Sequence, residues 1–317
     1  GYAVNAAATN GGRALTLAGM KYQFESQPKI IRRSNYHNFF PSVNLKYQIL
    51  QNFDWQIGWN KSIGRPPIDN LAGVFVIDEN ARRVTAPNRE LDPEYHNKYQ
   101  TRFGYYFSGR SPGSITLAFS KTTFRNTIQS ITYLPGEWEN DDPELQNFSL
   151  TTTRNLSDRV TTTKNMSFGY RQTLGFLPSE YLRGIGVFAN YDRTYLTQSG
   201  DGSGPAARRG TVTPHRVSGG LSYSLRRFSG SLNFVWGDDR PDGGTYGQWY
   251  GAITKFDMTA SWRLTKYATL FVQGRNISNQ PDLWYRSPPG VEQGKSPYLR
   301  QMEEYGANWT FGVRGVF

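Results

Sequence analysis

The sequence predicts an all-β fold, an antiparallel β-barrel that crosses a membrane with its strands. Apolar and polar residues alternate with a period of two along most of the chain, as in strands that have one apolar face. The links between these segments are short and long in turn, which is typical of outer-membrane barrels with short periplasmic turns and long extracellular loops. No segment approaches the roughly 18 to 20 consecutive apolar residues that a membrane-spanning helix needs, so a helical membrane protein is excluded.

The composition agrees with strands and restricts the chemistry. The chain holds 33 Gly, 20 Tyr, 19 Phe and 8 Trp, which favours strands and turns, and it has no Cys, which excludes disulfides, thiolate metal sites and cysteine nucleophiles. The net charge of +11 fits nucleic acid, anionic lipid or an anionic ligand equally well. The mean hydropathy of −0.62 is compatible with a membrane barrel, because the mean combines apolar residues that face lipid with polar residues that face water on alternate positions of each strand.

Taken in chain order, the alternation predicts about twelve strands. The first, at residues 14–25, is the weakest, and the clearest is at residues 255–265, where a helix could not separate the apolar from the polar residues. The short link at residues 50–53 implies a further strand directly after the stripe at residues 43–49, and the short link at residues 265–267 implies a further strand before the final one at residues 308–317. The stripes in the other strands are Val43/Leu45/Tyr47/Ile49, Tyr99/Phe103/Tyr105/Phe107, Ile115/Leu117/Phe119, Met166/Phe168/Tyr170, Ile185/Val187/Ala189/Tyr191, Val217/Leu221/Tyr223/Leu225, Leu232/Phe234/Trp236 and Trp309/Phe311/Val313/Phe317.

The links between the strands fall into two classes. Short ones are predicted at residues 50–53, 108–113, 175–184, 227–230 and 265–267, and long ones at about 26–41, 64–96, 125–160, 195–214, 238–250 and 279–304. Loops longer than about 12 to 15 residues are uncommon in compact soluble domains, so a soluble sandwich fits less well. The face opposite the aromatic one is rich in Gly, Ser, Thr, Asn, Gln and Arg, as an aqueous lumen requires.

Four segments, in order, carry a resemblance to a known family. They are Phe40–Tyr47 with Trp59–Pro66, Leu91–Glu94 with Tyr99, Gly274–Asn279, and Glu304–Gly306 with Gly312–Phe317. Together they resemble TonB-dependent outer-membrane receptors of Gram-negative bacteria. The resemblance implies a 22-stranded barrel with an N-terminal TonB box and plug, neither of which is visible in this sequence.

The length predicts a part of such a barrel. At about 26 residues for each strand and its loop, 22 strands need roughly 580 residues, so residues 1–317 are expected to form the C-terminal half as a single domain, without the plug and the first strands. The chain also begins at Gly1 without an initiator Met or a signal peptide, which predicts a mature or truncated piece.

The resemblance implies active uptake of a scarce ligand of the siderophore, cobalamin or oligosaccharide class, energised by the TonB complex through the missing plug. Two alternatives stay open from the residues alone: a complete twelve-stranded porin, channel or outer-membrane enzyme, and a soluble β-rich protein that binds glycans. No enzymatic activity, cofactor or metal is expected, because His37, His96 and His215 are far apart in sequence and Gly184 and Gly186 precede a strand pattern instead of a helix. The expected partners are outer-membrane lipid and lipopolysaccharide, the barrel assembly machinery and the ligand, and no nucleic acid.

The candidate site residues follow from these faces and loops. Arg102, Arg171, Arg263, Arg314 and Asp257 lie on the polar face and are predicted to line the lumen, where arginines could bind a plug carboxylate or an anionic substrate, or only pair with neighbours such as Asp192 and Asp257. The candidates for contact with lipopolysaccharide or an anionic ligand in the long loops are Arg32, Arg33, Arg82, Arg83, Arg208 and Arg209, for which solvated loop charge is the simpler interpretation. Trp284 is a further candidate for ligand contact in a long loop.

Two further groups of residues concern the membrane itself. Trp55, Trp262 and Trp309 are predicted to lie in the aromatic girdles at the membrane interfaces, with core tryptophans of a soluble sheet as the alternative. Phe311, Val313 and Phe317 resemble the terminal signal that the barrel assembly machinery reads.

Overall fold

The structure is a computed structural model that describes residues 37–72, 76–78, 80–138, 145–199, 212–241, 248–287 and 297–315. The chain divides into two compact units. The wall unit comprises Ser42–Asn60, Asn97–Thr123 and Thr161–Phe317, and the loop unit comprises Gly1–Pro41, Lys61–His96 and Phe124–Val160. The predicted strand at residues 14–25, together with Arg32, Arg33, Arg208, Arg209 and Phe317, lies outside the described residues.

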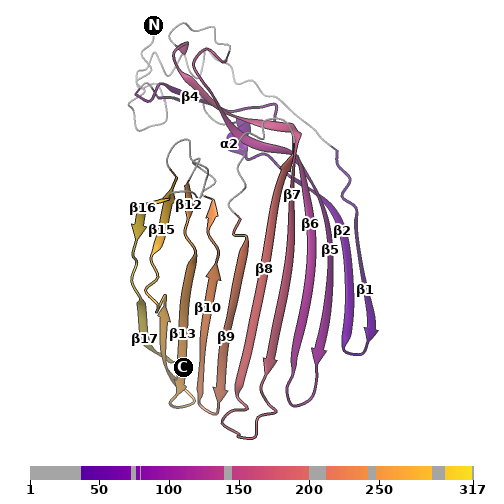
Figure 1. Cartoon of the computed structure of the whole chain (residues 1–317), viewed down its shortest axis with the longest axis vertical. Coiled ribbons are helices and arrows are strands. Elements are labelled where there is room, and N and C mark those ends of the chain that lie inside the picture. The colour runs from indigo at the N-terminus through magenta and orange to yellow at the C-terminus, as the bar shows by residue number, and fades with distance from the viewer. Residues whose placement is uncertain are drawn as a thin grey trace. The chain divides into compact units, whose positions relative to one another are not determined.

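The main sheet is antiparallel along a path of strands that follow one another in chain order (Figure 1). This confirms the predicted fold class. Eleven of the twelve predicted strands lie on the path, since the twelfth falls outside the described residues. The path runs β1 (Ser42–Leu50), β2 (Phe53–Gly64), β5 (Glu94–Phe107), β6 (Gly113–Tyr133), β7 (Ser149–Thr173), β8 (Ile185–Ser199), β9 (His215–Leu225), β10 (Phe228–Gly237), β13 (Ile253–Arg263), β14 (Ala268–Arg275) and β17 (Asn308–Gly315).

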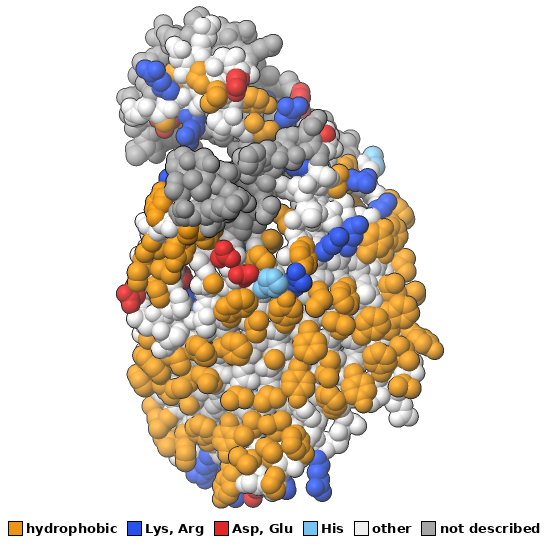
Figure 2. Space-filling model, viewed as in Figure 1, with side chains coloured by type: hydrophobic (Ala, Val, Ile, Leu, Met, Phe, Trp, Pro, Cys, Tyr) orange, Lys and Arg blue, Asp and Glu red, His pale blue; other side chains and the backbone are white. Residues whose placement is uncertain are grey.

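The strand register builds one continuous apolar face in the wall unit. Leu232 of β10 pairs with Leu221 on one side and Met258 on the other, and Trp262 pairs with Phe228 and with Leu270. A strand's side chains alternate between faces, so these pairs place apolar residues beside apolar residues across β9, β10, β13 and β14. Figure 2 shows the resulting field of hydrophobic side chains.

That apolar face is not covered by protein among the described residues. Phe311 is 73% exposed and Leu45 is 62% exposed, although both are strongly apolar. Surfaces of this kind are rare on soluble monomers because each buried Å² of apolar area gains about 25 cal/mol. The face therefore has the character of a surface that is solvated by lipid.

The opposite face carries hydroxyl and amide groups. Ser229 lies 2.7 Å from Ser261 and Ser231 lies 2.9 Å from Thr259, oxygen to oxygen, across the β10–β13 pair. Some aromatic residues depart from the predicted polar character of this face, Phe188 and Phe271 among them. Phe188 packs over Gly220 and Phe271 over Gly312, and a Cβ at Gly312 would lie 2.7 Å from the Phe271 ring. Glycine is required there because the ring occupies the space of a side chain.

The connections agree with the prediction at the short links and differ at some long ones. Residues 125–160 were expected to form a loop, but β6 continues to Tyr133 and β7 begins at Ser149. Likewise, β8 continues to Ser199 into the predicted loop at residues 195–214. These extensions were missed because their sequences are polar on both faces, so the apolar stripe that marks the other strands is absent.

The remaining long links contain short elements. In the loop unit these are α2 (Ile68–Ala72), β3 (Val76–Asp78) and β4 (Arg83–Ala86), of which β4 pairs in parallel with β7. In the wall unit, β11 (Arg240–Pro241), β12 (Gln248–Tyr250), β15 (Asp282–Arg286) and β16 (Tyr298–Glu303) form a separate four-stranded sheet, here called the outer sheet. No helix among the described residues is long and apolar enough to cross a membrane.

Candidate functional site

One face of the outer sheet carries a row of three residues, Arg240, Tyr250 and Trp284. Tyr250 pairs with Arg240 on one side and with Trp284 on the other, so the three side chains project from the same face. The guanidinium carbon of Arg240 lies 4.0 Å from the centroid of the Tyr250 ring, and the Tyr250 and Trp284 ring centroids are 5.3 Å apart. We call these residues the arginine–aromatic row.

Further polar groups lie on the same face. Gln248 is buried, pairs with Arg286 across the sheet, and its Oε1 accepts a hydrogen bond from Nη1 of Arg300. The other face is aromatic, with Trp249 and Tyr285 stacked at 5.8 Å between centroids. The first face thus presents several guanidinium groups beside two aromatic rings. Guanidinium groups bind carboxylate or other oxyanions, and the rings can stack on planar groups.

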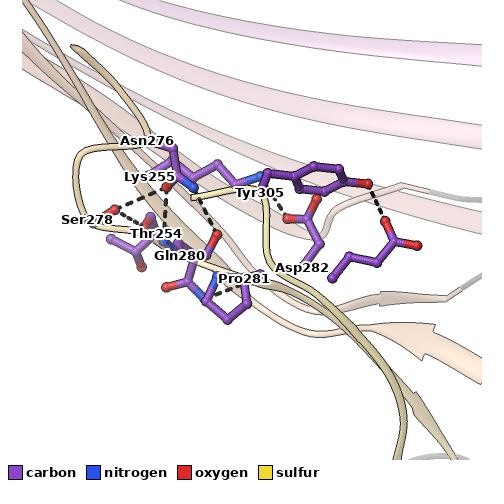
Figure 3. A network of polar contacts seen from close by, with 9 residues as sticks. Thr254, Lys255, Asn276, Ser278, Gln280, Pro281, Asp282 and Tyr305 are labelled. Atoms are coloured by element: carbon purple, nitrogen blue, oxygen red, sulfur yellow. Dashed lines mark hydrogen bonds and ion pairs between the residues drawn. The ribbon is translucent and has the colours of Figure 1, made fainter. Parts of the chain in front are cut away.

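An ion pair shows that this face continues the polar face of the wall. Lys255 Nζ lies 2.7 Å from Asp282 Oδ1, and both side chains are about one-third exposed (Figure 3). Lys255 lies on the polar face of β13, in step with Asp257, and Asp282 lies in step with Trp284 on β15. The arginine–aromatic row therefore belongs to the wet side of the wall and not to the lipid-facing side.

A tight turn after β14 fixes where β15 begins. Asn276 has φ of 49°, its N–H donates to Asp257 Oδ1 at 2.8 Å, and its side chain bonds both the N–H and the C=O of Gln280 at 3.0 and 3.1 Å. Ser278 Oγ donates to the carbonyl of Thr254 at 3.2 Å. Figure 3 shows the contacts of Asn276 with Gln280 and of Ser278 with Thr254 beside the ion pair. Asparagine suits this position because its short amide tolerates positive φ and bonds the local backbone. The segment is the Gly274–Asn279 motif noted in the sequence.

Charge interactions perturb two groups outside the wall strands. The Tyr305 hydroxyl donates to the Glu303 carboxylate, and this contact raises the pKa of Tyr305 above its ordinary value. Burial, together with the neighbouring Asp238 carboxylate, raises the pKa of Asp239. Both shifts favour the neutral forms of these side chains.

The predicted lumen residues all lie on the polar face of their strands. Arg263 and Arg314 both pair with Thr269, one from each side. Arg314 also lies 5.5 Å from the Phe271 centroid, at a cavity of about 310 Å³ that is lined with Ser229, Ser231, Thr259 and Ser261. Asp257 accepts from the Asn276 N–H, and Asp192 accepts from Ser167 Oγ at 2.5 Å. Neither carboxylate forms an ion pair with Arg102, Arg171, Arg263 or Arg314 in the described part of the chain.

The loop unit contains a second cavity, of about 580 Å³. Its lining combines Arg65, Asp69 and Glu94 with hydroxyl groups, among them those of Ser130 and Thr152. Arg82 and Arg83 do not line it. Arg82 occupies a turn with φ of 45°, and Arg83 begins β4 with an exposed side chain. Of the loop candidates, Trp284 is the one that the described residues place among other groups able to bind a ligand.

The tryptophans of the predicted girdles lie on the apolar face. Trp55 stacks on Phe103 at 6.2 Å and donates from Nε1 to Thr101 Oγ1 at 2.8 Å. Trp262 is 53% exposed, and Trp309 stacks on Phe311 at 6.4 Å. Phe311 and Val313, from the predicted assembly signal, are among the most exposed apolar residues of the described chain.

Sequence reasoning missed Arg240, Gln248, Tyr250, Arg286 and Arg300. A usable signal existed, because Trp249–Tyr250 and Trp284–Arg286 each concentrate aromatic residues in a long loop, where burial in a core is not expected. Their convergence depended on strand pairing between loops that lie more than 30 residues apart in the chain.

Comparisons with known proteins agree with the fold. Residues 11–277 match the family model described as TonB dependent receptor-like, beta-barrel. No curated protein matches the sequence. Among solved structures, a mutant of the ferric enterobactin receptor PfeA from Pseudomonas aeruginosa aligns with a TM-score of 0.60 and 14% identity over 88% of this chain and 40% of that chain.

Two other structures give similar values. The siderophore receptor PirA from Pseudomonas aeruginosa aligns with a TM-score of 0.55 and 12% identity, over 88% of this chain and 42% of its own. The FrpB iron transporter from Neisseria meningitidis aligns with a TM-score of 0.57 and 11% identity, over 87% and 39%. At these identities the likeness concerns the fold, and the chain spans about 40% of the length of these structures.

Proposed function

Because the chain belongs to the TonB-dependent receptor β-barrel family, whose members are outer-membrane transporters and not enzymes, we propose that it supplies part of the barrel wall and outer loops of an active uptake receptor. In this proposal the ligand binds at the outer end of the wet face. It then passes through the lumen when the TonB complex acts on an N-terminal plug. The described residues contribute wall and ligand-binding surface, and the coupling device lies elsewhere in the protein.

The edges of the sheet support placement in a longer chain. Among the residues that the structure describes, β1 and β17 end the strand path, and all nine residues of β1 are exposed. In hydrocarbon an unpaired backbone N–H or C=O costs several kcal/mol, so each edge needs a further strand. We propose that these strands come from the same protein, with this chain as the C-terminal half of a 22-stranded barrel. The coding sequence upstream tests this, and a gene without plug or additional strands would refute it.

The arginine–aromatic row is the observation that carries the ligand class. It combines a guanidinium held over a ring with a second ring on the wet face, beside Arg286 and Arg300. A small anionic ligand with planar groups fits this chemistry better than a neutral oligosaccharide does. Of the siderophore, cobalamin and oligosaccharide classes, we therefore favour an anionic ferric siderophore. The similar structures include a ferric enterobactin receptor and a siderophore receptor, which supports the same class.

Uptake and binding measurements test the proposal. Cells that lack the receptor should fail to accumulate one radiolabelled anionic ferric siderophore, and a plasmid copy should restore uptake only when TonB is present. Purified receptor should bind the same complex, with loss of binding in Trp284→Ala. Uptake that is independent of TonB, or discrete ion conductance from this chain alone in a bilayer, would instead favour a small pore-forming barrel.

A further inference from the structure

A β-bulge interrupts the pairing of β15 with β16 in the outer sheet. Trp284 pairs with Gln301, and the next residue of β15, Tyr285, pairs with Leu299. Arg300 is therefore an extra residue of β16 that has no partner in the register. An extra residue of this kind bends its strand and redirects a side chain, and bulges are common beside ligand sites for that reason.

The side chain of Arg300 reaches Gln248, which lies two strands away. Nη1 of Arg300 donates to Oε1 of Gln248 across β15, and Figure 1 shows β12, β15 and β16 in this order. Gln248 is 3% exposed and pairs with Arg286 of β15. A guanidinium group has only donors, so the amide oxygen is the acceptor, and the amide keeps its NH2 group as a donor. We call Gln248, Arg286 and Arg300 the donor cluster.

No acid in the described part of the chain neutralises the donor cluster. Neither Arg286 nor Arg300 forms an ion pair with a described residue. The acids of the outer strands have other partners, since Asp282 pairs with the lysine of β13 at 2.7 Å and Glu303 accepts from Gln301 Nε2 at 2.7 Å. An ionised carboxylate is only an acceptor, so it complements a cluster that offers only donors.

The donor cluster and the arginine–aromatic row are two separate positions on one face. Arg240 pairs with Tyr250, and Gln248 pairs with Arg286, so the two arginines lie two strands apart and two residues apart along the strands. At about 4.8 Å between strands and 3.4 Å per residue, their Cα atoms are roughly 12 Å apart. Because Tyr250 holds one guanidinium group and Gln248 holds another, the wet face presents two anion-binding points.

We propose that the donor cluster binds a second anionic group of the ligand, so that the ligand carries two separate carboxylates. Gln248 is then a specificity-determining residue, because its neutral amide orients Arg300 without neutralising it. A glutamate in its place would set a carboxylate against Arg300 and beside Arg286, and it would occupy the donors that the ligand needs. The inference rests on the proposed function, since it concerns the same ligand, and it narrows an anionic siderophore to one with two carboxylate groups.

Diacids and their monoesters test the second binding point without any siderophore. Adipate, suberate and sebacate, and the monomethyl ester of each, are titrated calorimetrically into purified full-length receptor. For at least one chain length the diacid should bind on the order of tenfold more tightly than its monoester, since a hydrogen bond between charged groups corresponds to about that factor. In Gln248→Glu this advantage should disappear, while the affinity for the monoester should stay the same.

Matched variants separate the charge at this position from other effects. Gln48→Glu adds the same charge on β1, beside the short turn at residues 50–53, and should keep the diacid advantage. Gln248→Leu removes the acceptor without adding a charge and should reduce the advantage only in part. Protease cleavage of the outer sheet should be no faster in Gln248→Glu than in wild type, because the new carboxylate still accepts from Arg300.

Each remaining outcome decides against the donor cluster or against the proposed function. Equal affinity of wild type for diacid and monoester, loss of monoester binding in Gln248→Glu, or faster cleavage in that variant would overturn the inference. A diacid preference in a receptor that accumulates no siderophore would refute the proposed function and support the donor cluster. Siderophore uptake without a diacid preference would do the reverse.

Discussion

Replacing Arg240 by Gln should weaken binding of an anionic ferric siderophore while leaving the barrel intact. The guanidinium lies 4.0 Å from the Tyr250 centroid, so the ring holds it in one orientation on the wet face of the outer sheet. Glutamine is shorter but keeps a polar group that can donate hydrogen bonds, and it removes the charge. The substitution therefore tests the contribution of the Arg240 charge to ligand binding.

The expected magnitude follows from two contributions. An exposed cation–π contact contributes about 0.5–1 kcal/mol, which is lost in both the free and the bound receptor and so mainly affects the stability of the outer sheet. A hydrogen bond from a charged donor to the ligand contributes about 1.5–3 kcal/mol, and its loss corresponds to a Kd that is roughly 10 to 150 times higher. Arg240→Lys should recover part of the loss, because lysine keeps the charge but not the planar fork.

Calorimetric titration of purified receptor with the ferric siderophore measures this change, and Arg226→Gln serves as the control. Arg226 carries the same charge and forms an exposed pair with Glu180 at 3.6 Å, in the turn between β9 and β10, at the opposite end of β10 from Arg240. An unchanged Kd in Arg240→Gln would refute the role of the row. An equal loss for a neutral ligand would show that the substitution acts through folding of the outer sheet and not through charge.

Four further results are expected. Asn276→Ala removes the hydrogen bonds to Gln280 and places Ala at positive φ, so it should lower the free energy of unfolding by about 1–3 kcal/mol and lower the unfolding temperature in detergent. Asn279→Gly, at the neighbouring residue with positive φ, should leave the unfolding temperature unchanged. Asp282→Asn weakens the ion pair with Lys255, and protease cleavage within residues 282–303 should become faster, while Asp238→Asn should leave the rate unchanged. Gly312→Val places a Cβ 2.7 Å from the Phe271 ring and should lower the yield of folded barrel. Adding Phe271→Ala to Gly312→Val should restore the yield, and a normal yield in Gly312→Val alone would contradict this packing. Brominated lipid should quench the tryptophan fluorescence of the receptor in part through Trp262 and Trp309, so a Trp262→Phe/Trp309→Phe variant should show reduced quenching. Unchanged quenching in that variant would place both residues away from lipid.

Much of the wall could be predicted from the sequence because lipid and water impose opposite demands on neighbouring residues. In the strand at residues 255–265, the apolar and polar residues separate completely, and the structure pairs Phe256 with Phe234 and Thr259 with Ser231 as that separation requires. Where both faces are wet the signal disappears. This is why the outer parts of β6 and β7, with segments such as Ser149–Thr153, were predicted as loop.

The candidate site was only partly predictable for a different reason. Trp284 could be selected as an aromatic residue in a long loop, but its neighbours Tyr250 and Arg240 come from another loop and reach it only through the pairing of β12 with β11 and β15. The alternation of side chains predicts the polar face for the arginines. Their partners were not predictable, since Asp257 accepts from the backbone of the Asn276 turn, a contact that depends on positive φ.

The sequence by itself determined the strand period, the alternating link lengths and the sidedness of nearly every strand, because a lipid-facing wall repeats the same local rule at every second residue. Tertiary structure alone decided which loop segments pair into the outer sheet, and it alone brought Arg240, Tyr250 and Trp284 into one row. The physical reason is that register and pairing between distant segments depend on turn geometry and strand length. Neither is encoded in the local alternation of side chains.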